Sequence, residues 1–452
     1  MSTYSQALAA HWSATSYDDL PADIVRATKR ALLDTLAAGL AGVGTSETNA
    51  ASAGMAMIHR SDPEGAMLWG QGVRLPAGAA ALVNGTTAHA REMDDFDGCG
   101  HTGAVVVPTV CATADVTRAD GKTVMAAIAA GYDIAGRMLE ASGGYQPHNG
   151  RGWHSTATCG SFGAAAAAAK VLGLPAEQFT SALGIAGTYV GGVWAFMADG
   201  AMTKRLHPGK AAENGVNAAF LAKAGMTGPT QILEAKWGGF FPTYCGESAR
   251  PEALLAELGE RNWILSTGIK PYACCRGAHA GIDALLYLMQ AHGFAGEQIA
   301  EMLIHGTEYT ERLVGNRRIN TVLDAQMSLP YSLAVTAFGG LADLPQFDPL
   351  RTSEPCVQRL LDNTRVVADR DPQVRESPVV EVVLKDGRRF SHQVLFAKGD
   401  PRNPVSDDEL LSKARSLVVP VLGEPRFLQI VRAIDELEQV RDFRTVTALL
   451  AA

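Results

Sequence analysis

The chain of 452 residues is short of charged side chains, which make up 19% of it, against 47% hydrophobic residues. It has no excess of positive charge, because its net charge is −8 at pH 7. General nucleic-acid binding needs a basic face that displaces counterions, so no nucleic-acid partner is expected. No apolar run reaches the ~18 residues that a membrane-spanning helix needs, so no membrane partner is expected either.

Cysteine is also scarce, with seven residues and no CxxC pair. The odd number argues against a disulfide framework and favours reduced thiols in a cytoplasm. The N-terminal stretch lacks the basic-then-apolar order of a signal peptide. Gly70 and Gly72 lack the third glycine of a dinucleotide-binding fingerprint, and no P-loop occurs. We therefore expect a cytoplasmic protein with no cofactor and no bound metal.

The first part of the chain, up to the neighbourhood of Trp263, has apolar residues at helical spacing. Helices are predicted over 21–44, 122–141, 163–172, 211–224 and 252–257. Beyond Trp263, strands are predicted over 264–269 and 301–305. A hairpin is predicted where Lys385-Asp386-Gly387 separates the runs 379–384 and 388–397. Helical patterns cover 281–292, 328–339 and 357–366 between these strands, and 407–417 and 426–438 in the tail.

These patterns predict a mainly α protein with an α+β second domain. Residues 1–266 and 404–452 form the large all-helical domain in this prediction, and residues 267–403 form a smaller α+β lid inserted into it. A chain of this length exceeds one ordinary hydrophobic core, which agrees with two domains.

Imidazole, ammonium and carboxylate groups gather in four short blocks. The blocks are 88–103 (AHAREMDDFDGCGHTG), 152–163 (GWHSTATCGSFG), 203–215 (TKRLHPGKAAENG) and 270–283 (KPYACCRGAHAGID). Brought together by a fold, such groups make an acid/base site for an anionic substrate. The composition of the blocks favours a cofactor-independent lyase or isomerase that acts on a small polycarboxylate.

The first block allows three interpretations. Asp94, Asp95 and Asp97 can belong to a solvated or helix-capping loop. With His101 they offer ligands for a hard metal ion, although their spacing matches neither a calcium loop nor a zinc motif. The third interpretation is a carboxylate–imidazole unit, in which Asp95 orients His101 or raises its pKa.

The second block places His154 just before a helix of small residues. Ser155 or Thr156 can cap that helix, and its free N–H groups can receive an anion. The structural alternative is a buried histidine bonded to a backbone carbonyl. A serine hydrolase is rejected, because the G-x-S-x-G elbow needs a glycine two residues before the serine, and Cys159 stands at that position before Ser161.

The third and fourth blocks supply cationic groups. Lys204 is predicted to bind a carboxylate or to transfer a proton, since a buried lysine shifts its pKa readily. His207, three residues on, suits a structural role as well as a functional one. Lys270 opens the α+β region, and His279 begins the helix that follows. The cysteines between them, Cys274 and Cys275, are best explained as small buried residues.

At these residues the chain resembles the MmgE/PrpD family, which includes 2-methylcitrate dehydratase, cis-aconitate decarboxylase and iminodisuccinate epimerase. The resemblance runs from Ser5 to Val440. Its motifs are Asn84-Gly85 with Ala88-His89, Asp95-Phe96-Asp97, Gly152-Trp153-His154-Ser155-Thr156, Lys204 with His207 and Gly209, Thr227-Gly228-Pro229, Lys270-Pro271-Tyr272 with Cys274 and His279, and Gln326-Met327-Ser328-Leu329-Pro330-Tyr331. The resemblance implies a helical domain made from both chain ends, a smaller α+β lid, a homodimer, and an active site between the domains.

The resemblance also implies the site residues. In the decarboxylase branch the family's site groups correspond here to Asp95, His101, His154, Lys204, Lys270 and Tyr331. We expect His154 to act as the base and His101 or Tyr331 as the acid. Lys204 and Lys270 would offset an enediolate-like charge. The remaining residues that we expect to bind substrate are His279, Arg205, Gln326 and Ser155.

Two departures from the decarboxylase branch guide the choice of reaction. The loop from Asp97 to His101 is shorter than in that branch, and Cys275 stands where the branch has a histidine. The first hypothesis is therefore a carbon–oxygen lyase that dehydrates a 2-methylcitrate-like acid. An epimerase or isomerase and a decarboxylase of a related dicarboxylate are the alternatives. A non-catalytic carboxylate-binding protein is the alternative from another class.

Overall fold

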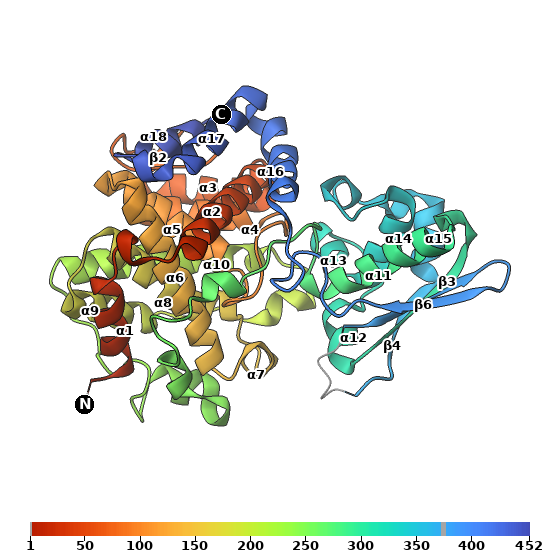
Figure 1. The fold of residues 1–452 in the computed structure, drawn as a ribbon, viewed down its shortest axis with the longest axis horizontal. Coiled ribbons are helices and arrows are strands. Elements are labelled where there is room, and N and C mark those ends of the chain that lie inside the picture. The colour runs from red at the N-terminus through yellow and green to blue at the C-terminus, as the bar shows by residue number, and fades with distance from the viewer. Residues whose placement is uncertain (1, 372–376) are drawn as a thin grey trace. The chain divides into compact units, whose positions relative to one another are not determined.

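The computed structural model describes residues 2–371 and 377–452 and contains two compact units (Figure 1). The first, called the helical unit below, consists of Met1–Ala90, Asp94–Thr267 and Asp407–Ala452. The second, called the sheet unit, consists of Arg91–Met93 and Gly268–Ser406. A mainly α architecture with an α+β second unit is thus confirmed.

The helical unit is built from thirteen described α-helices. They are α1 (Tyr4–Ala14), α2 (Ala22–Gly42), α3 (Ser46–Ile58), α4 (Ala77–His89), α5 (Gly103–Thr117), α6 (Gly121–Ala141), α7 (Tyr145–Gly150), α8 (Ser155–Val171), α9 (Ala176–Gly187), α10 (Thr203–Lys223), α16 (Asp407–Leu422), α17 (Glu424–Asp435) and α18 (Arg444–Thr447). The unit is not wholly helical, because β1 (Ala66–Met67) and β2 (Arg74–Leu75) form a short antiparallel pair.

Helix α8 lies at the centre of the helical unit and contacts α5, α6, α9 and α10. Its run Ala164–Ala169 is fully buried. Small side chains let neighbouring backbones approach closely, and the glycines of α10 have the same effect. A Cβ on Gly215 of α10 would lie 2.3 Å from the Cβ of Ala164, and one on Gly209 would lie 2.2 Å from the carbonyl oxygen of Leu82 in α4. Helix α10 is therefore held tightly between α4 and α8.

A buried ion pair joins distant segments of the helical unit. The Arg137 guanidinium donates to the Asp133 carboxylate at 2.8 Å and also to four backbone carbonyls between residues 254 and 261. The Trp12 indole N–H donates to the same carboxylate at 3.1 Å. Because buried charges are stable only when their partners are satisfied, this network fixes α1 and the 254–261 segment against α6.

The sheet unit contains a four-stranded sheet in the order β4-β3-β5-β6. Its strands are β3 (Ile299–Gly306), β4 (Thr364–Ala368), β5 (Val379–Leu384) and β6 (Arg389–Gln393). Its helices are α11 (Arg276–His292), α12 (Glu308–Val314), α13 (Val322–Gln326), α14 (Leu329–Gly339) and α15 (Pro355–Asp362). Strand β3 pairs in parallel with β4 and antiparallel with β5, and β6 completes the predicted hairpin. Helix α11 contacts β5 and β6.

Three local predictions are wrong. The 264–269 segment is no strand: Trp263–Ser266 is a 3₁₀ turn, which the Asn262 side chain caps by accepting the N–H of Ile264. The helix predicted over 357–366 ends at Asp362, because the following residues pair with β3. The helix predicted over 252–257 is a 3₁₀ turn over Pro251–Leu254. Glu257 has left-handed backbone with a φ of 51°, and the carbonyls of Leu254 and Ala256 accept from the Arg137 side chain instead of continuing a helix.

All seven cysteines are free. Within residues 2–371 and 377–452, the helices lack the combination of length and apolar character that crossing a bilayer requires.

The close approach of α4 and α10 yields a stability prediction. In Gly209→Ala the new methyl group meets the Leu82 carbonyl, which cannot rotate away, so the free energy of unfolding should fall by about 1–3 kcal/mol. In α3, Gly54 has open space around its Cα, so Gly54→Ala should instead raise stability by about 0.5–1 kcal/mol. Urea titrations of both variants test this; equal effects would contradict the packing described here.

Candidate active site

Four helix ends of the helical unit bring imidazole, ammonium and carboxylate groups together. His89 is the last residue of α4, and His154 is the N-cap of α8. Lys204 lies in the first turn of α10, with His207 one turn further on. His101 lies in the loop between α4 and α5. Residues from three of the four sequence blocks therefore meet within one unit, as the clustering of their chemistry predicts.

The loop before α5 turns sharply through left-handed backbone positions. Asp97, Gly98 and Gly100 have φ values of 72°, 60° and 125°. The Thr102 hydroxyl accepts the N–H of Cys99 at 3.1 Å, which closes the turn. A Cβ on Gly100 would lie 2.6 Å from Oγ1 of Thr156, so glycine is required where this loop meets α8.

Asp94 connects two imidazoles. Its Oδ2 atom lies 2.9 Å from Nδ1 of His89 and 3.0 Å from Nδ1 of His101. The ammonium of Lys204 lies 2.9 Å from Nε2 of His89. An ammonium donates but does not accept, so Nε2 of His89 is the acceptor and its Nδ1 carries the proton that Asp94 accepts. We name this set, Lys204–His89–Asp94–His101, the relay cluster.

The carboxylate beside His101 is thus Asp94, whereas Asp95 was expected in that place. Nδ1 of His101 does lie 3.1 Å from the backbone oxygen of Asp95, so both neighbours hold the ring. The Asp95 side chain turns the other way, into the interior. It accepts the hydroxyl of Tyr132 at 2.7 Å and the N–H of Gly103 at 2.9 Å.

The environment of Asp95 keeps its carboxyl group neutral. Burial raises the pKa of Asp95 to about 8, although the hydrogen bond from Tyr132 lowers it. The neighbouring carboxylates Asp94 and Asp34 raise it further. Asp95 is therefore a buried positioning group behind His101 rather than a charge that faces a ligand.

His154 lies beside the relay cluster, with its ring centroid 6.4 Å from that of His101. Its Nδ1 atom lies 2.8 Å from Nδ1 of His207. Burial lowers the pKa of His154 well below its usual value, and the neighbouring His207 and Lys204 add to this effect. The ring is therefore neutral at physiological pH, as a proton acceptor must be.

The rest of the predicted site in the helical unit is buried. Ser155 Oγ accepts the side-chain amide of Asn149 at 3.0 Å, and Asn149 Oδ1 accepts the Ser155 N–H at 3.2 Å. This clamp fixes the start of α8. Arg205 is 2% exposed within α10. Thr156 Oγ1 is buried and, within the described parts of the chain, has no hydrogen-bond partner.

In the sheet unit, Lys270 is fully buried and its ammonium donates to Oε2 of Glu92 at 2.7 Å. His279 is also fully buried, with Nε2 3.2 Å from the carbonyl oxygen of Cys274. Burial lowers the pKa of His279 well below its usual value. These two predicted binding residues thus lie in a buried, polar part of the sheet unit.

Gln326 and Tyr331 have backbone partners within the sheet unit. The Gln326 amide donates to the carbonyls of Arg91 and Ala273, at 3.0 and 3.1 Å. The Tyr331 hydroxyl donates to the carbonyl of Gln346 at 2.7 Å and accepts the N–H of Arg351 at 3.0 Å. Burial raises the pKa of this hydroxyl. These contacts favour structural roles for both residues and leave His101 as the better candidate for the acid.

The trio His89, Asp94 and His101 also brings three metal-ligand atoms within 4.8 Å of one another. A metal ion there would replace the two Nδ1 protons that Asp94 accepts. His89 would then carry its proton on Nε2, directed at the Lys204 ammonium, so two donors would face each other. The positions of these groups therefore fit proton transfer better than metal binding.

Sequence reasoning missed two residues of this arrangement and undervalued two others. Glu92, the partner of Lys270, was not singled out, although it stands in the acidic run before Asp94. Tyr132 gave no signal, because it lies in an ordinary helical pattern. His89 was noted only within a motif, and Asp94 only as a loop residue or a metal ligand.

Comparison with known proteins identifies the family. The MmgE/PrpD N-terminal domain matches residues 6–252, and the MmgE/PrpD C-terminal domain matches residues 272–437. The chain therefore belongs to the MmgE/PrpD family, as the sequence motifs indicated.

Several curated relatives align over nearly the whole chain. A cis-aconitate decarboxylase-like protein of Aspergillus oryzae is 31% identical over 463 residues, which cover 96% of this chain and 94% of that protein. The human cis-aconitate decarboxylase is 29% identical, covering 94% of this chain and 90% of its own length. The Aspergillus terreus cis-aconitate decarboxylase is 27% identical, covering 97% and 94%. The chain is thus an MmgE/PrpD family enzyme, and these relatives are named as cis-aconitate decarboxylases or as a protein like them.

The neutral state of Asp95 can be tested by stability against pH. In the unfolded chain this carboxyl loses its proton near pH 3.8, but in the folded protein only near pH 8. The folded state binds more protons between these values, so this group lowers the free energy of unfolding as pH rises from 4 to 8. The Asp95→Asn variant has no carboxyl group at this position, so its free energy of unfolding does not fall for this reason.

The melting temperature of Asp95→Asn should therefore rise relative to wild type between pH 5 and pH 8. Asp408→Asn, which removes an exposed carboxylate, serves as the control. Its melting temperature relative to wild type should change little between pH 5 and pH 8. If the melting temperature of Asp95→Asn relative to wild type stays constant or falls between pH 5 and pH 8, the carboxyl group of Asp95 is ionised in the folded protein.

Proposed function

We propose that this protein is a cofactor-independent lyase that decarboxylates an unsaturated tricarboxylate such as cis-aconitate. The relatives named as cis-aconitate decarboxylases, aligned over nearly the whole chain, support this proposal. The observation that favours it most is the relay cluster, which places an ammonium, a carboxylate and two imidazoles in continuous hydrogen-bond contact. These groups can bind an anionic substrate and move a proton without a cofactor.

The chemistry of decarboxylation needs one positive charge and one proton. The bond from the CH₂ group to the leaving carboxylate breaks, and its electron pair forms a new double bond as CO₂ departs. The former double bond shifts its pair to the vinylic carbon, where the adjacent carboxylate delocalises it as an enediolate-like charge. A proton then adds to that carbon. An ammonium in a site that excludes water stabilises such a charge strongly.

Within this proposal Lys204 binds the carboxylate on which the charge develops. His154, a neutral imidazole, gives the proton to the substrate carbon. His101 is the acid for a leaving hydroxyl group in a dehydration, because the Asp94 carboxylate at its Nδ1 stabilises a protonated ring. Lys270 keeps its predicted role as a second carboxylate-binding group, which rests on the family resemblance.

Dehydration of a 2-methylcitrate-like acid is the second candidate, and the neutral state of His154 favours it. A neutral, buried imidazole can take a proton next to a carboxylate, which dehydration requires and decarboxylation does not. Epimerisation would use the same base. The names of the relatives favour decarboxylation over both.

A substrate panel followed by NMR distinguishes these reactions. In D₂O with EDTA present, cis-aconitate should lose CO₂ and gain one deuterium at the former vinylic carbon. Water loss from 2-methylcitrate without CO₂ release would favour the second candidate and contradict the first. Loss of all turnover on EDTA treatment would contradict a metal-independent reaction. Binding without turnover of any substrate would favour a carboxylate-binding protein.

The role of Lys204 can be tested by Lys204→Met, which keeps the length of the side chain but removes its charge. The value of kcat should fall by about 10²–10³, because the developing negative charge loses its main partner. Lys210→Met is the matched control, since Lys210 is an exposed residue of the same helix paired with Glu213. Equal activity of Lys204→Met and the control would remove Lys204 from the mechanism.

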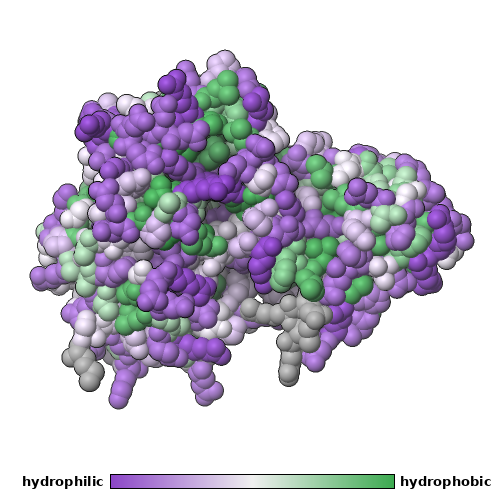
Figure 2. Space-filling view, viewed as in Figure 1, coloured by the Kyte–Doolittle hydropathy of each residue, from purple (hydrophilic) through white to green (hydrophobic). Residues whose placement is uncertain are grey.

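A homodimer is a further part of the proposal and rests on the family resemblance. Trp237 is 96% exposed and Met226 is 53% exposed, and a second copy of the chain would bury such apolar groups. Figure 2 shows several apolar areas on the otherwise hydrophilic surface in view. Sedimentation equilibrium should give twice the 47.6 kDa of one chain, and a monomer at micromolar concentration would contradict it.

A further inference from the structure

The contact between His154 and His207 fixes one proton between two rings. Their Nδ1 atoms lie 2.8 Å apart, which is hydrogen-bond distance. Only one of two neutral rings can carry its proton at Nδ1 in such a contact, because two N–H groups would repel each other. The other ring must then carry its proton at Nε2. The pair therefore has two opposite tautomeric arrangements, which interconvert when this proton crosses the contact while one Nε2 atom loses a proton and the other gains one.

Both rings are neutral where they lie. His154 is 2% exposed, and its ring meets those of Trp194 and Phe196 edge-on at 5.2 and 5.9 Å. Burial lowers the pKa of His207 to about 4, and the Lys204 charge adds to the effect. Neutral imidazoles both accept and donate, which a protonated ring cannot do.

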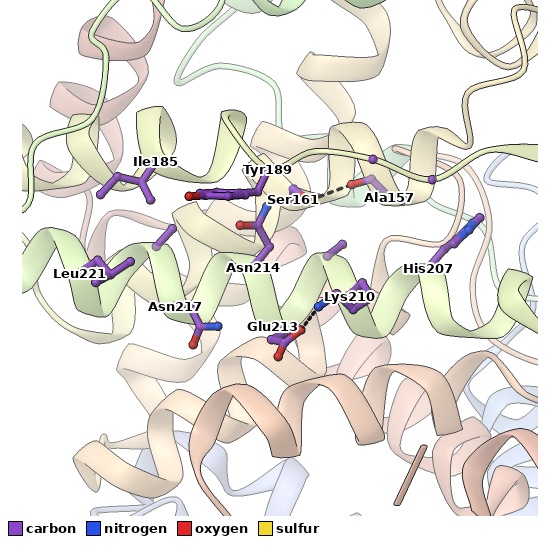
Figure 3. A pocket seen from close by; sticks show the side chains of 14 residues that line it. Ala157, Ser161, Ile185, Tyr189, His207, Lys210, Glu213, Asn214, Asn217 and Leu221 are labelled. Atoms are coloured by element: carbon purple, nitrogen blue, oxygen red, sulfur yellow. Dashed lines mark hydrogen bonds and ion pairs between the residues drawn. The ribbon is translucent and has the colours of Figure 1, made fainter. Parts of the chain in front are cut away.

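The two rings have different surroundings. His154 lies beside His101 and the relay cluster. His207 lines a cavity of about 630 Å³ between α8, α9 and α10, together with Asn214, Asn217 and Tyr189 (Figure 3). Because Tyr189 is 77% exposed, this cavity reaches the surface of the helical unit. In the described parts of the chain, neither Nε2 atom has a hydrogen bond to a protein group.

Gly192 allows the loop after α9 to cover this pair. It has a φ of 121°, and a Cβ there would lie 2.6 Å from the Cβ of Ala157 and 3.5 Å from the His207 ring. Its carbonyl accepts the backbone N–H of His154 at 3.0 Å. The loop thus fixes His154 and contacts His207, so it helps to hold the two rings at hydrogen-bond distance.

We propose that His154 and His207 form a proton relay that connects the substrate, bound beside the relay cluster, with solvent in the cavity beside α10. The proposal rests on the proposed function, in which His154 exchanges a proton with the substrate carbon. His207 exchanges no proton with substrate itself; it supplies or removes the proton of His154.

The two candidate reactions use the relay in opposite directions, since decarboxylation adds a proton to carbon and dehydration removes one. When a proton is consumed, His154 gives its Nε2 proton to carbon, His207 passes its Nδ1 proton to Nδ1 of His154, and water in the cavity protonates Nε2 of His207. When a proton is abstracted, every step runs in reverse and the cavity receives it. No oxidant, metal or additional reactant is needed.

Three variants test the relay. His207→Ala should lower kcat at least about tenfold with little change in KM, because the exchange of a proton with solvent is lost. Added imidazole, which is far smaller than the cavity, should restore turnover. His207→Gln can still donate a hydrogen bond to His154 but cannot transfer a proton, so it should stay slow. Asn217→Ala, which lines the same cavity without contacting His154, is the control and should keep wild-type turnover with or without imidazole.

The outcomes separate the two proposals. Wild-type turnover in His207→Ala, full activity in His207→Gln, or a slow His207→Ala that imidazole fails to restore while circular dichroism shows a folded protein would each overturn the relay alone. Failure of the wild-type protein to turn over any polycarboxylate would overturn the proposed function, and the relay with it.

Discussion

The contact between the Lys204 ammonium and Nε2 of His89 determines the protonation of the whole cluster. An ammonium has no lone pair, so the imidazole must accept, and its single remaining proton must lie on Nδ1. Asp94 accepts that proton and also faces Nδ1 of His101. One cation at the start of α10 thus fixes the tautomer of a histidine at the end of α4, and through it the position of the carboxylate that holds His101.

The fold serves this contact through small residues. His89 and Lys204 can be 2.9 Å apart only because α4 and α10 approach closely a turn or so away, where Gly85 faces Gly209. A Cβ on Gly85 would lie 2.8 Å from the Cα of Gly209. The alanine-rich α8 keeps the other side of α10 equally close. The high content of small residues therefore shapes the candidate site as well as the core.

Sequence alone identified the chemistry better than the individual contacts. The blocks around His101, His154 and Lys204 stand out because polar groups are rare in the apolar stretches around them. The choice between Asp94 and Asp95 could not be made, since adjacent residues point in different directions and left-handed backbone at Asp97 and Gly98 decides which one meets the ring.

Elements whose structure depends on residues far away in the sequence could likewise not be predicted. Strand β4 continues a helical apolar pattern, and only its parallel pairing with β3 makes it a strand. The Trp263–Ser266 segment has the composition of a strand, but the Asn262 cap and the hydrogen bond from the Trp263 N–H to Asp133 turn it into a 3₁₀ segment. The β5–β6 hairpin was found correctly because its turn signal is local.

The protonation of His89 is the most direct test of this account. In protein labelled with ¹⁵N-histidine, long-range ¹H–¹⁵N spectra distinguish a protonated Nδ1 from a protonated Nε2. We expect His89 to be neutral with its proton on Nδ1, and we expect Lys204→Met to alter this ring more than any other. A proton on Nε2 of His89 would mean that Lys204 is a neutral amine, and the charge assigned to the site would be wrong.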